Sequence, residues 1–234
     1  MIPLSDENPT LVRPVVTITL ILLCVLVYVW ELSLGDPQMD RVLTVLGFTP
    51  NAFSHAEEAQ VAYRALPIWT TLLTSIFLHA STMHVAGNML YLWIFGNNVE
   101  DAMGHVKFIV FYLVSGFAAL FTMLLVDPNS HTPVVGASGA ISGVLAAYML
   151  LYPRARVTVL VPILLLHIRA VWVVGIWFVL QLVSAATTPA SEPGTAWWAH
   201  VGGFAAGLLM TPLLKSRSIP YFGPIDPRGP WANG

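Results

Sequence analysis

Four polar side chains interrupt the long apolar stretches of this sequence: His84, Asn88, Ser138 and His200. A serine with a histidine base is the minimal arrangement for nucleophilic catalysis. His84 and Asn88 are four residues apart, which places them on the same face of a helix. Together with the backbone N–H of Ser138, these two side chains could donate hydrogen bonds to an oxyanion. The chemistry that the four residues predict is acyl transfer through a serine.

Each of these residues also has a plainer interpretation when it is taken alone. A serine in a glycine-rich membrane helix is usually a packing residue. A histidine beside Trp197 and Trp198 is more often a residue of the membrane interface than a catalytic base. The case for catalysis therefore depends on whether the four residues occupy related positions.

Two other site chemistries fit the sequence less well. His79, His84 and His200 could in principle bind a metal, but no Asp or Glu lies near them at ligand spacing. We therefore predict no metal and no cofactor. Asp127 is a candidate third member of a triad, but it precedes Pro128 at the end of an apolar stretch and is interpreted as a loop residue. The sequence favours a Ser–His dyad.

Composition places this chemistry inside a membrane. Of the 234 residues, 56% are hydrophobic and only 9% are charged, whereas soluble domains carry about 25% charged residues. The net charge of −2 gives no reason to expect a nucleic-acid partner. Since a spanning helix needs roughly 20 apolar residues, we predict an all-α polytopic membrane protein. Its six transmembrane helices are expected at about residues 15–34, 82–98, 106–126, 137–153, 168–186 and 196–214.

Two apolar stretches are too long for one span and are divided. Residues 67–80 are expected to form a helical piece at the interface before the second span. Pro162 interrupts the stretch that begins at Val157, so the segment VTVLVPILLL is expected to be an apolar interfacial turn. The long outer loop over 35–66 is expected to have a function of its own.

Lysine and arginine are distributed unequally between the two sides of the predicted bundle. With a cytoplasmic N-terminus, eight of them fall on the inner side and only Arg41 and Arg64 on the outer side, as the positive-inside rule requires. Both termini are then cytoplasmic. The expected organisation is a short cytoplasmic N-terminus over 1–14, a six-helix domain over 15–214 and a flexible cytoplasmic tail over 215–234.

The candidate residues fall at one depth in this topology. His84 precedes Glu100 by 16 residues, Ser138 precedes Arg154 by 16, and His200 precedes Lys215 by 15. At 1.5 Å per residue, each lies roughly 22–24 Å above the charged inner edge of its helix. Small residues four apart also let two membrane helices approach closely. The pairs Gly139/Gly143 and Gly203/Gly207 are therefore expected to bring Ser138 and His200 together.

In this order and on these spans, the residues resemble those of the rhomboid family of intramembrane serine proteases. The resemblance covers about residues 67–210. The matching pieces are His84-x-x-x-Asn88, Gly136-x-Ser138-Gly139 and Ala199-His200-x-Gly202-Gly203-x-x-x-Gly207. The segments LLTSIFLHAS and FGNNVEDAMG on either side of the second span also look like the family pattern.

The resemblance implies a role for each residue. Ser138 would be the nucleophile and His200 the general base that later protonates the leaving amine. Asn88, His84 and the Ser138 amide would stabilise the oxyanion. Gly136 would lie where the loop enters the helix and let the backbone approach the substrate. The substrates would be transmembrane segments of other proteins, cut near the outer face of the lipid bilayer.

The sequence departs from the family pattern at two places. Many members carry Trp-Arg before the second span, where this chain reads Trp69-Thr70-Thr71, and Arg64 is a candidate replacement for that arginine. Some members carry an aromatic residue four positions after the nucleophile, where this chain has Ser142. The ring of His200 is therefore expected to have another packing partner.

The function expected from these observations is intramembrane serine endopeptidase activity. The alternative is a proteolytically inactive rhomboid-like adaptor that binds transmembrane helices. We expect substrates to enter beside the span over 168–186, with the loop over 186–196 covering the site. No transit or signal features are apparent at the N-terminus, so the expected location is the prokaryotic plasma (inner) membrane. The oligomeric state is left open.

Overall fold

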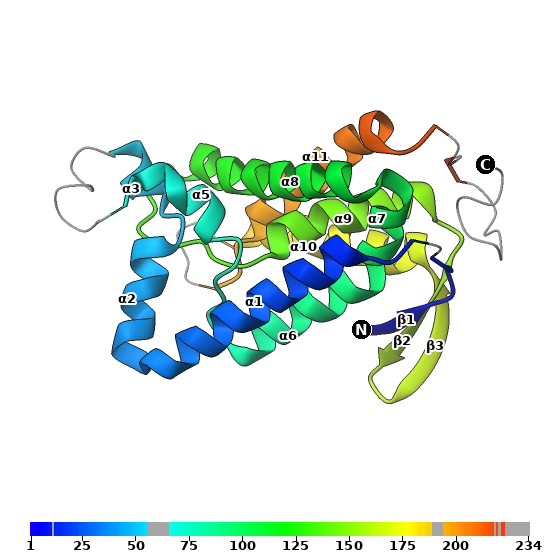
Figure 1. Cartoon of the computed structure of the whole chain (residues 1–234), viewed down its shortest axis with the longest axis horizontal. Helices are drawn as coiled ribbons and strands as arrows, with labels where there is room; N and C mark the ends of the chain where they lie inside the picture. The colour runs from blue at the N-terminus through cyan, green and yellow to red at the C-terminus, as the bar shows by residue number, and fades with distance from the viewer. Residues whose placement is uncertain (11, 56–65, 189–193, 218, 220, 223–234) are drawn as a thin grey trace.

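A computed structural model describes residues 1–10, 12–55, 66–188, 194–217, 219 and 221–222. The described chain is mostly helical, as predicted, and its long helices lie side by side (Figure 1). Among the described residues, three helices are long and apolar enough to cross a membrane: α1 (Val15–Leu34), α8 (His105–Val126) and α10 (Ala170–Thr187). Shorter or less apolar helices occupy the other predicted spans, namely α6 (Thr82–Tyr91) with its continuation, α9 (Ser138–Leu151) and α11 (Trp197–Leu214).

Shorter elements connect these helices. The predicted outer loop contains α2 (Asp36–Leu46) and α3 (Pro50–Ser54). The predicted interfacial helical piece consists only of η1 (Ile68–Thr70) and α5 (Thr71–Thr74). The second span continues past α6 through the π-helical segment η2 (Leu92–Gly96) into α7 (Asn97–Met103). It therefore ends five residues later than the sequence predicted.

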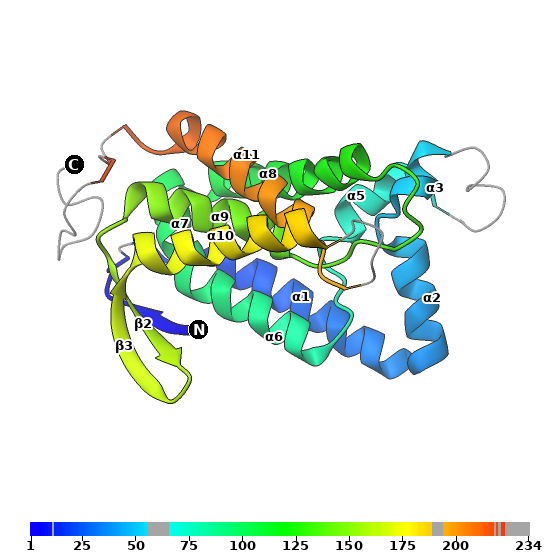
Figure 2. The ribbon, with the colours of Figure 1, turned by 180° about the vertical axis from the view of Figure 1, so that it is seen from behind.

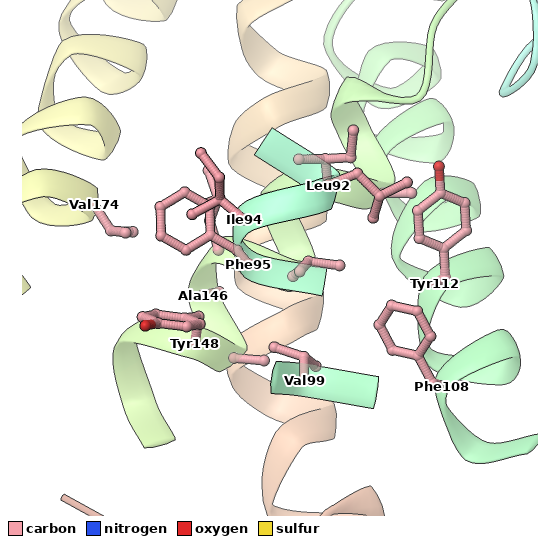
Figure 3. Close-up of a cluster of buried hydrophobic side chains, with 14 of the residues drawn as sticks. Leu92, Ile94, Phe95, Val99, Phe108, Tyr112, Ala146, Tyr148 and Val174 are labelled. Carbon is pink, nitrogen blue, oxygen red and sulfur yellow. The ribbon is translucent and has the colours of Figure 1, made fainter. Parts of the chain in front are cut away.

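Helix α9 lies at the centre of the bundle and packs against α8, α10, α11 and η2. Most of its residues are buried, although the helix is uniformly apolar rather than amphipathic. Figure 3 shows the apolar cluster around its second half. This cluster joins side chains of the five segments η2, α7, α8, α9 and α10: Leu92, Ile94, Phe95, Val99, Phe108, Tyr112, Ala146, Tyr148 and Val174. The core thus holds the site helix from all sides.

The buried carboxylate of Glu100 joins α1 to α7. The first N–H groups of any helix lack partners within the helix, and α1 begins at Val15. Glu100 of α7 accepts hydrogen bonds from the backbone N–H groups of Val16 at 2.9 Å and Thr17 at 2.7 Å. The Thr17 hydroxyl and the Nδ1 atom of His105 also lie within 2.7 Å of this carboxylate. Its buried charge is compensated by these donors.

The region predicted as an interfacial turn is instead a β-hairpin. Strand β2 (Arg156–Val161) pairs antiparallel with β3 (Leu164–Arg169), and β1 (Ile2–Asp6) adds to the other edge of β2. The three strands lie at the end of the bundle where α10 begins (Figure 2). Ser138 is the first residue of α9, and the length of that helix separates it from β2. Pro162 is in the connection between β2 and β3, where it interrupts no ladder. The expectation of an all-α chain was wrong at these strands.

The N-terminal strand is fixed to the bundle by one polar contact. The hydroxyl of Tyr148 on α9 donates a hydrogen bond of 2.5 Å to the Asp6 carboxyl group. Burial raises the pKa of Asp6 from 3.8 to about 6. Asp6 therefore binds a proton more tightly in the folded state than in the unfolded chain. Protonated Asp6 contributes to the stability of the folded state at low pH. That contribution is lost as the pH rises through the folded pKa.

We expect the free energy of unfolding to fall by roughly 1–2 kcal/mol between about pH 4 and about pH 6 through Asp6. Substitution Asp6→Asn should remove this part of the pH dependence, because the amide stays neutral and still accepts from Tyr148. Thermal unfolding of the purified protein at several pH values measures the difference between variant and wild type. Asp40→Asn, at an exposed position on α2, is the control. Equal slopes for wild type and Asp6→Asn would contradict the expectation.

Candidate functional site

The candidate residues come from three different helices and line one cavity of about 730 Å³. His84 and Asn88 lie on α6, Ser138 is the first residue of α9, and His200 is in the first turn of α11. All four line this cavity, together with Gly136. The common depth inferred from spacing in the sequence thus corresponds to a common cavity in the structure.

Ser138 and His200 are in direct contact. The distance between Ser138 Oγ and His200 Nε2 is 2.8 Å, which is hydrogen-bonding distance. His200 is buried and Ser138 is partly exposed to the cavity. A serine hydroxyl in this position can pass its proton to the imidazole when its oxygen attacks a carbonyl carbon.

A third residue, Gln181 of α10, contacts the other side of the imidazole. Its Oε1 atom is 2.7 Å from His200 Nδ1, and its Nε2 atom donates to the carbonyl oxygen of Trp177 at 3.2 Å. Because that carbonyl can only accept, the amide must turn its oxygen toward His200. Nδ1 of His200 therefore carries the proton, and Nε2 is free to accept from Ser138.

Sequence analysis did not identify Gln181, although one signal was available. Gln181 is the only amide, acid or base within α10 (Ala170–Thr187). A polar residue inside a span is a functional candidate by default. Asp127, considered as a third member, does lie outside the helices, at the C-terminal end of α8.

Two tryptophans supply the packing partner that the ring of His200 was expected to have. The ring centroid of Trp177 lies 5.8 Å from that of His200, with the planes tilted by 37°. Trp197 contacts the same imidazole edge-on at 6.2 Å. Ser142, at the position where an aromatic residue was considered, donates instead to the Ser138 carbonyl at 2.7 Å.

Potential donors for an oxyanion line the same cavity as Ser138 and His200. The Nδ2 atom of Asn88 is buried and has no hydrogen-bond partner among the described residues. An unsatisfied buried donor is uncommon and requires an explanation. Gly136, with φ of +114°, precedes Ser138, and a Cβ there would lie 2.7 Å from the ring of His84. Only glycine fits both this backbone conformation and this approach.

The two glycine pairs bring α9 and α11 into backbone contact. A Cβ atom on Gly203 would overlap the carbonyl oxygen of Gly139, and one on Gly207 would lie 2.6 Å from Cα of Gly143. The Cβ positions of Gly139 and Gly143 themselves point toward α8 rather than toward α11. The close packing that the sequence predicted between two helices therefore involves three.

Some expectations concern residues that the structure does not describe. Arg64, the candidate replacement for the missing arginine, lies outside the described residues, as do 189–193 of the expected covering loop. Among the described residues, no three His, Cys, Asp or Glu side chains are grouped so that they could hold a metal ion. His79 instead contacts His84, with ring centroids 5.1 Å apart.

Comparison with known proteins identifies the family of this chain. The model of the rhomboid domain matches residues 67–217, which include every residue of the candidate site. The chain belongs to the rhomboid family. Its apolar helices and this rhomboid domain together identify an integral membrane protein.

Several curated rhomboid proteins are similar to this chain. Rhomboid protease AarA of Providencia stuartii is 26% identical over 83% of this chain and 70% of its own length. Rhomboid-like protein 11, chloroplastic, of Arabidopsis thaliana is 28% identical over 65% of this chain and 55% of its own length. The human presenilin-associated rhomboid-like protein, mitochondrial, is 35% identical over 38% of this chain. This chain covers only 24% of the length of the mitochondrial protein.

We expect Gly203→Ala to lower the free energy of unfolding by roughly 3 kcal/mol or more, because the new methyl group meets backbone atoms that cannot move aside. Gly175→Ala on α10 is the matched control, since nothing lies within 4 Å of its Cβ position. That control should be neutral or slightly stabilising. Thermal unfolding of both variants measures the effect. Equal stability of the two variants would show that the α9–α11 contact is looser than described.

Proposed function

We propose that this rhomboid protein is an intramembrane serine endopeptidase that cleaves transmembrane segments of other membrane proteins. The observation that carries the proposal is the contact of 2.8 Å between Ser138 Oγ and His200 Nε2. The hydrogen bond from His200 Nδ1 to Gln181 supports it, because it leaves Nε2 unprotonated. A serine kept only for packing would need neither a base nor a defined tautomer of that base.

In the proposed reaction, Ser138 Oγ attacks the carbonyl carbon of the scissile peptide bond while His200 Nε2 takes its proton. The tetrahedral intermediate then collapses, and His200 returns the proton to the leaving amine. Water entering the cavity attacks the resulting ester in the same way, with His200 again acting as the base. The carboxylic acid product leaves and Ser138 regains its proton. The reaction needs no cofactor.

The oxyanion is proposed to be stabilised by the side chains of Asn88 and His84 and by the backbone N–H of Ser138. Asn88 brings a buried Nδ2 donor that has no partner among the described residues, and a substrate oxygen would supply one. Donors fixed in place before the reaction stabilise developing charge effectively, because they need not reorganise. Gly136 leaves space for the substrate backbone between these donors and Ser138.

The proposal includes six transmembrane spans, with both termini in the cytoplasm and the Ser138 cavity near the outer face. It also includes the prokaryotic plasma (inner) membrane as the location. Substrate would enter beside α10, which lies between the site and the lipid. Only 28% of the most apolar 18-residue stretch of α10 is buried inside the protein, compared with 39% for α8. A helix with little buried surface can move at lower cost than its neighbours.

Cleavage of a model transmembrane substrate by the purified protein in detergent tests this function. Wild type should cleave, and Ser138→Ala and His200→Ala should each reduce the rate by several orders of magnitude. Asn88→Ala should reduce turnover by roughly 10²–10³-fold, as expected for loss of an oxyanion donor. The thermal unfolding temperature of each variant shows whether folding is intact. A well-folded wild type that cleaves none of several substrates would favour the inactive helix-binding adaptor instead.

We assign Gln181 a positioning role and expect Gln181→Met to lower kcat by roughly 10–100-fold with little change in KM. Methionine preserves volume but cannot accept from Nδ1, so the imidazole loses its preferred tautomer and orientation. Gln181→Glu keeps an acceptor oxygen and should retain most of the activity. Steady-state cleavage kinetics of both variants provide the measurement. If the two substitutions reduced kcat equally, the hydrogen bond to His200 would have no part in the reaction.

A further inference from the structure

The hairpin of β2 and β3 exposes an unusual amount of apolar surface. The exposed fraction of the side chain reaches 87% for Ile163 and 61% for Leu164. Leu165 and Leu166, the next residues of β3, are exposed as well. Exposed apolar projections on an edge strand promote aggregation in water. This surface therefore requires an explanation that the proposed active site, at the other end of the bundle, does not provide.

The pairing register divides the hairpin into two different faces. One face carries only aliphatic side chains, and we call it the apolar face: Val157, Val159, Val161, Leu164, Leu166 and Ile168. The opposite face, which we call the basic face, carries the cross-strand pairs Arg156–Arg169 and Thr158–His167. Leu160 and Leu165 complete the basic face near the turn. The hairpin is therefore amphipathic along most of its length.

The apolar face points toward the helices. Val157 and Val159 are fully buried in the core of the bundle, and Val161 and Ile168 pack against that core. Only Leu164 and Leu166, near the turn, extend past the helices and are uncovered. Figure 1 and Figure 2 show the hairpin leaving the end of the bundle crosswise to the long helices. Leu164 and Leu166 therefore project from the face of the hairpin that packs against the helices.

The uncovered part lies on the strand that leads directly into an exposed apolar helix. Strand β3 ends at Arg169 and α10 begins at Ala170, without an intervening loop. Trp172 and Ile176 of α10 are exposed on a helix apolar enough to cross a membrane. Tryptophan near the end of such a helix is typical of the membrane interface. Leu164 and Leu166 are thus exposed on the strand that joins this apolar helix without a break.

The basic face fits the headgroup layer. Arg156 and Arg169 lie directly opposite each other and are both exposed. Like charges in that position repel each other unless an anion lies between them. No ion pair involves either arginine among the described residues. Glu7, the residue after β1, donates its backbone N–H to the carbonyl oxygen of Arg156. Anionic lipid phosphates would supply the missing negative charge.

We propose that the β2–β3 hairpin is an interfacial membrane anchor that lies on the leaflet at the end of the bundle away from Ser138. Its apolar face contacts the acyl chains through Leu164 and Leu166, and Arg156 and Arg169 bind anionic headgroups. Among the described residues, no strand pairs with the outer edge of β3. Since unpaired backbone groups are costly in hydrocarbon, the strands stay at headgroup level and only side chains reach the acyl chains.

Nitroxide spin labels on the full-length protein test this anchor. In a Cys24→Ala background, labels are placed separately at Leu166→Cys and His167→Cys, which are adjacent exposed positions on opposite faces. The protein is reconstituted in phosphatidylcholine vesicles with roughly 30% phosphatidylglycerol. Collisions with oxygen report acyl chains, and collisions with a water-soluble nickel chelate report water. Ile176→Cys is the lipid reference and Arg217→Cys, an exposed position after α11, is the aqueous reference.

The label at position 166 should behave like the one at 176, with oxygen collisions dominant, and the label at position 167 like the one at 217. Access of the nickel chelate to the labels at both hairpin positions would overturn the proposal. Shielding of the label at position 166 from both reagents would also overturn it, because it would indicate that a second protein copy covers this face. Removing phosphatidylglycerol should raise nickel access at position 166 by about twofold or more. In a variant that carries both Arg156→Gln and Arg169→Gln, removing phosphatidylglycerol should no longer change nickel access at position 166. If the change persisted, the two arginines would be excluded as the headgroup ligands.

Discussion

The contact between the backbones of α9 and α11 is the constraint on which the site depends. Gly203 and Gly207 leave no room for a Cβ atom against Gly139 and Gly143, so the two helices meet backbone to backbone. Ser138 and His200 each lie three residues or fewer before a member of these pairs. Their separation of 2.8 Å therefore follows from main-chain packing, which is stiffer than any arrangement made by side chains alone.

Some polar groups in this apolar bundle are satisfied by another group. Glu100 receives the free N–H groups at the start of α1, and the amide of Gln181 joins Trp177 to His200. The Nδ2 atom of Asn88 is an exception, one of nine buried side-chain polar atoms without a hydrogen-bond partner among the described residues. That exception lies in the cavity of Ser138, where an incoming oxyanion would complete the set. An unsatisfied donor is expected at a site that binds charge only during a reaction.

Local sequence was sufficient to place the long helices, since their apolar stretches are close to the length of a span. The residues lining the site could also be named, because polar residues in apolar helices are rare and the glycine spacing indicates which helices meet. Gln181 was missed because its role depends on α10 lying beside α11, which no local pattern shows. The hairpin was missed because a short apolar run around Pro162 fits a strand pair and an interfacial turn equally well. Strand β1 was not predicted for a related reason, because its partner strand β2 lies about 150 residues away in the sequence.

We propose that packing at this helix crossing activates Ser138. Labelling of the purified protein with a fluorophosphonate probe, followed by mass spectrometry of the adduct, tests this proposal without requiring knowledge of a substrate. We expect one adduct, on Ser138, which disappears in His200→Ala while the fold remains intact. An adduct on any other serine, or labelling of Ser138 that persists without His200, would contradict it.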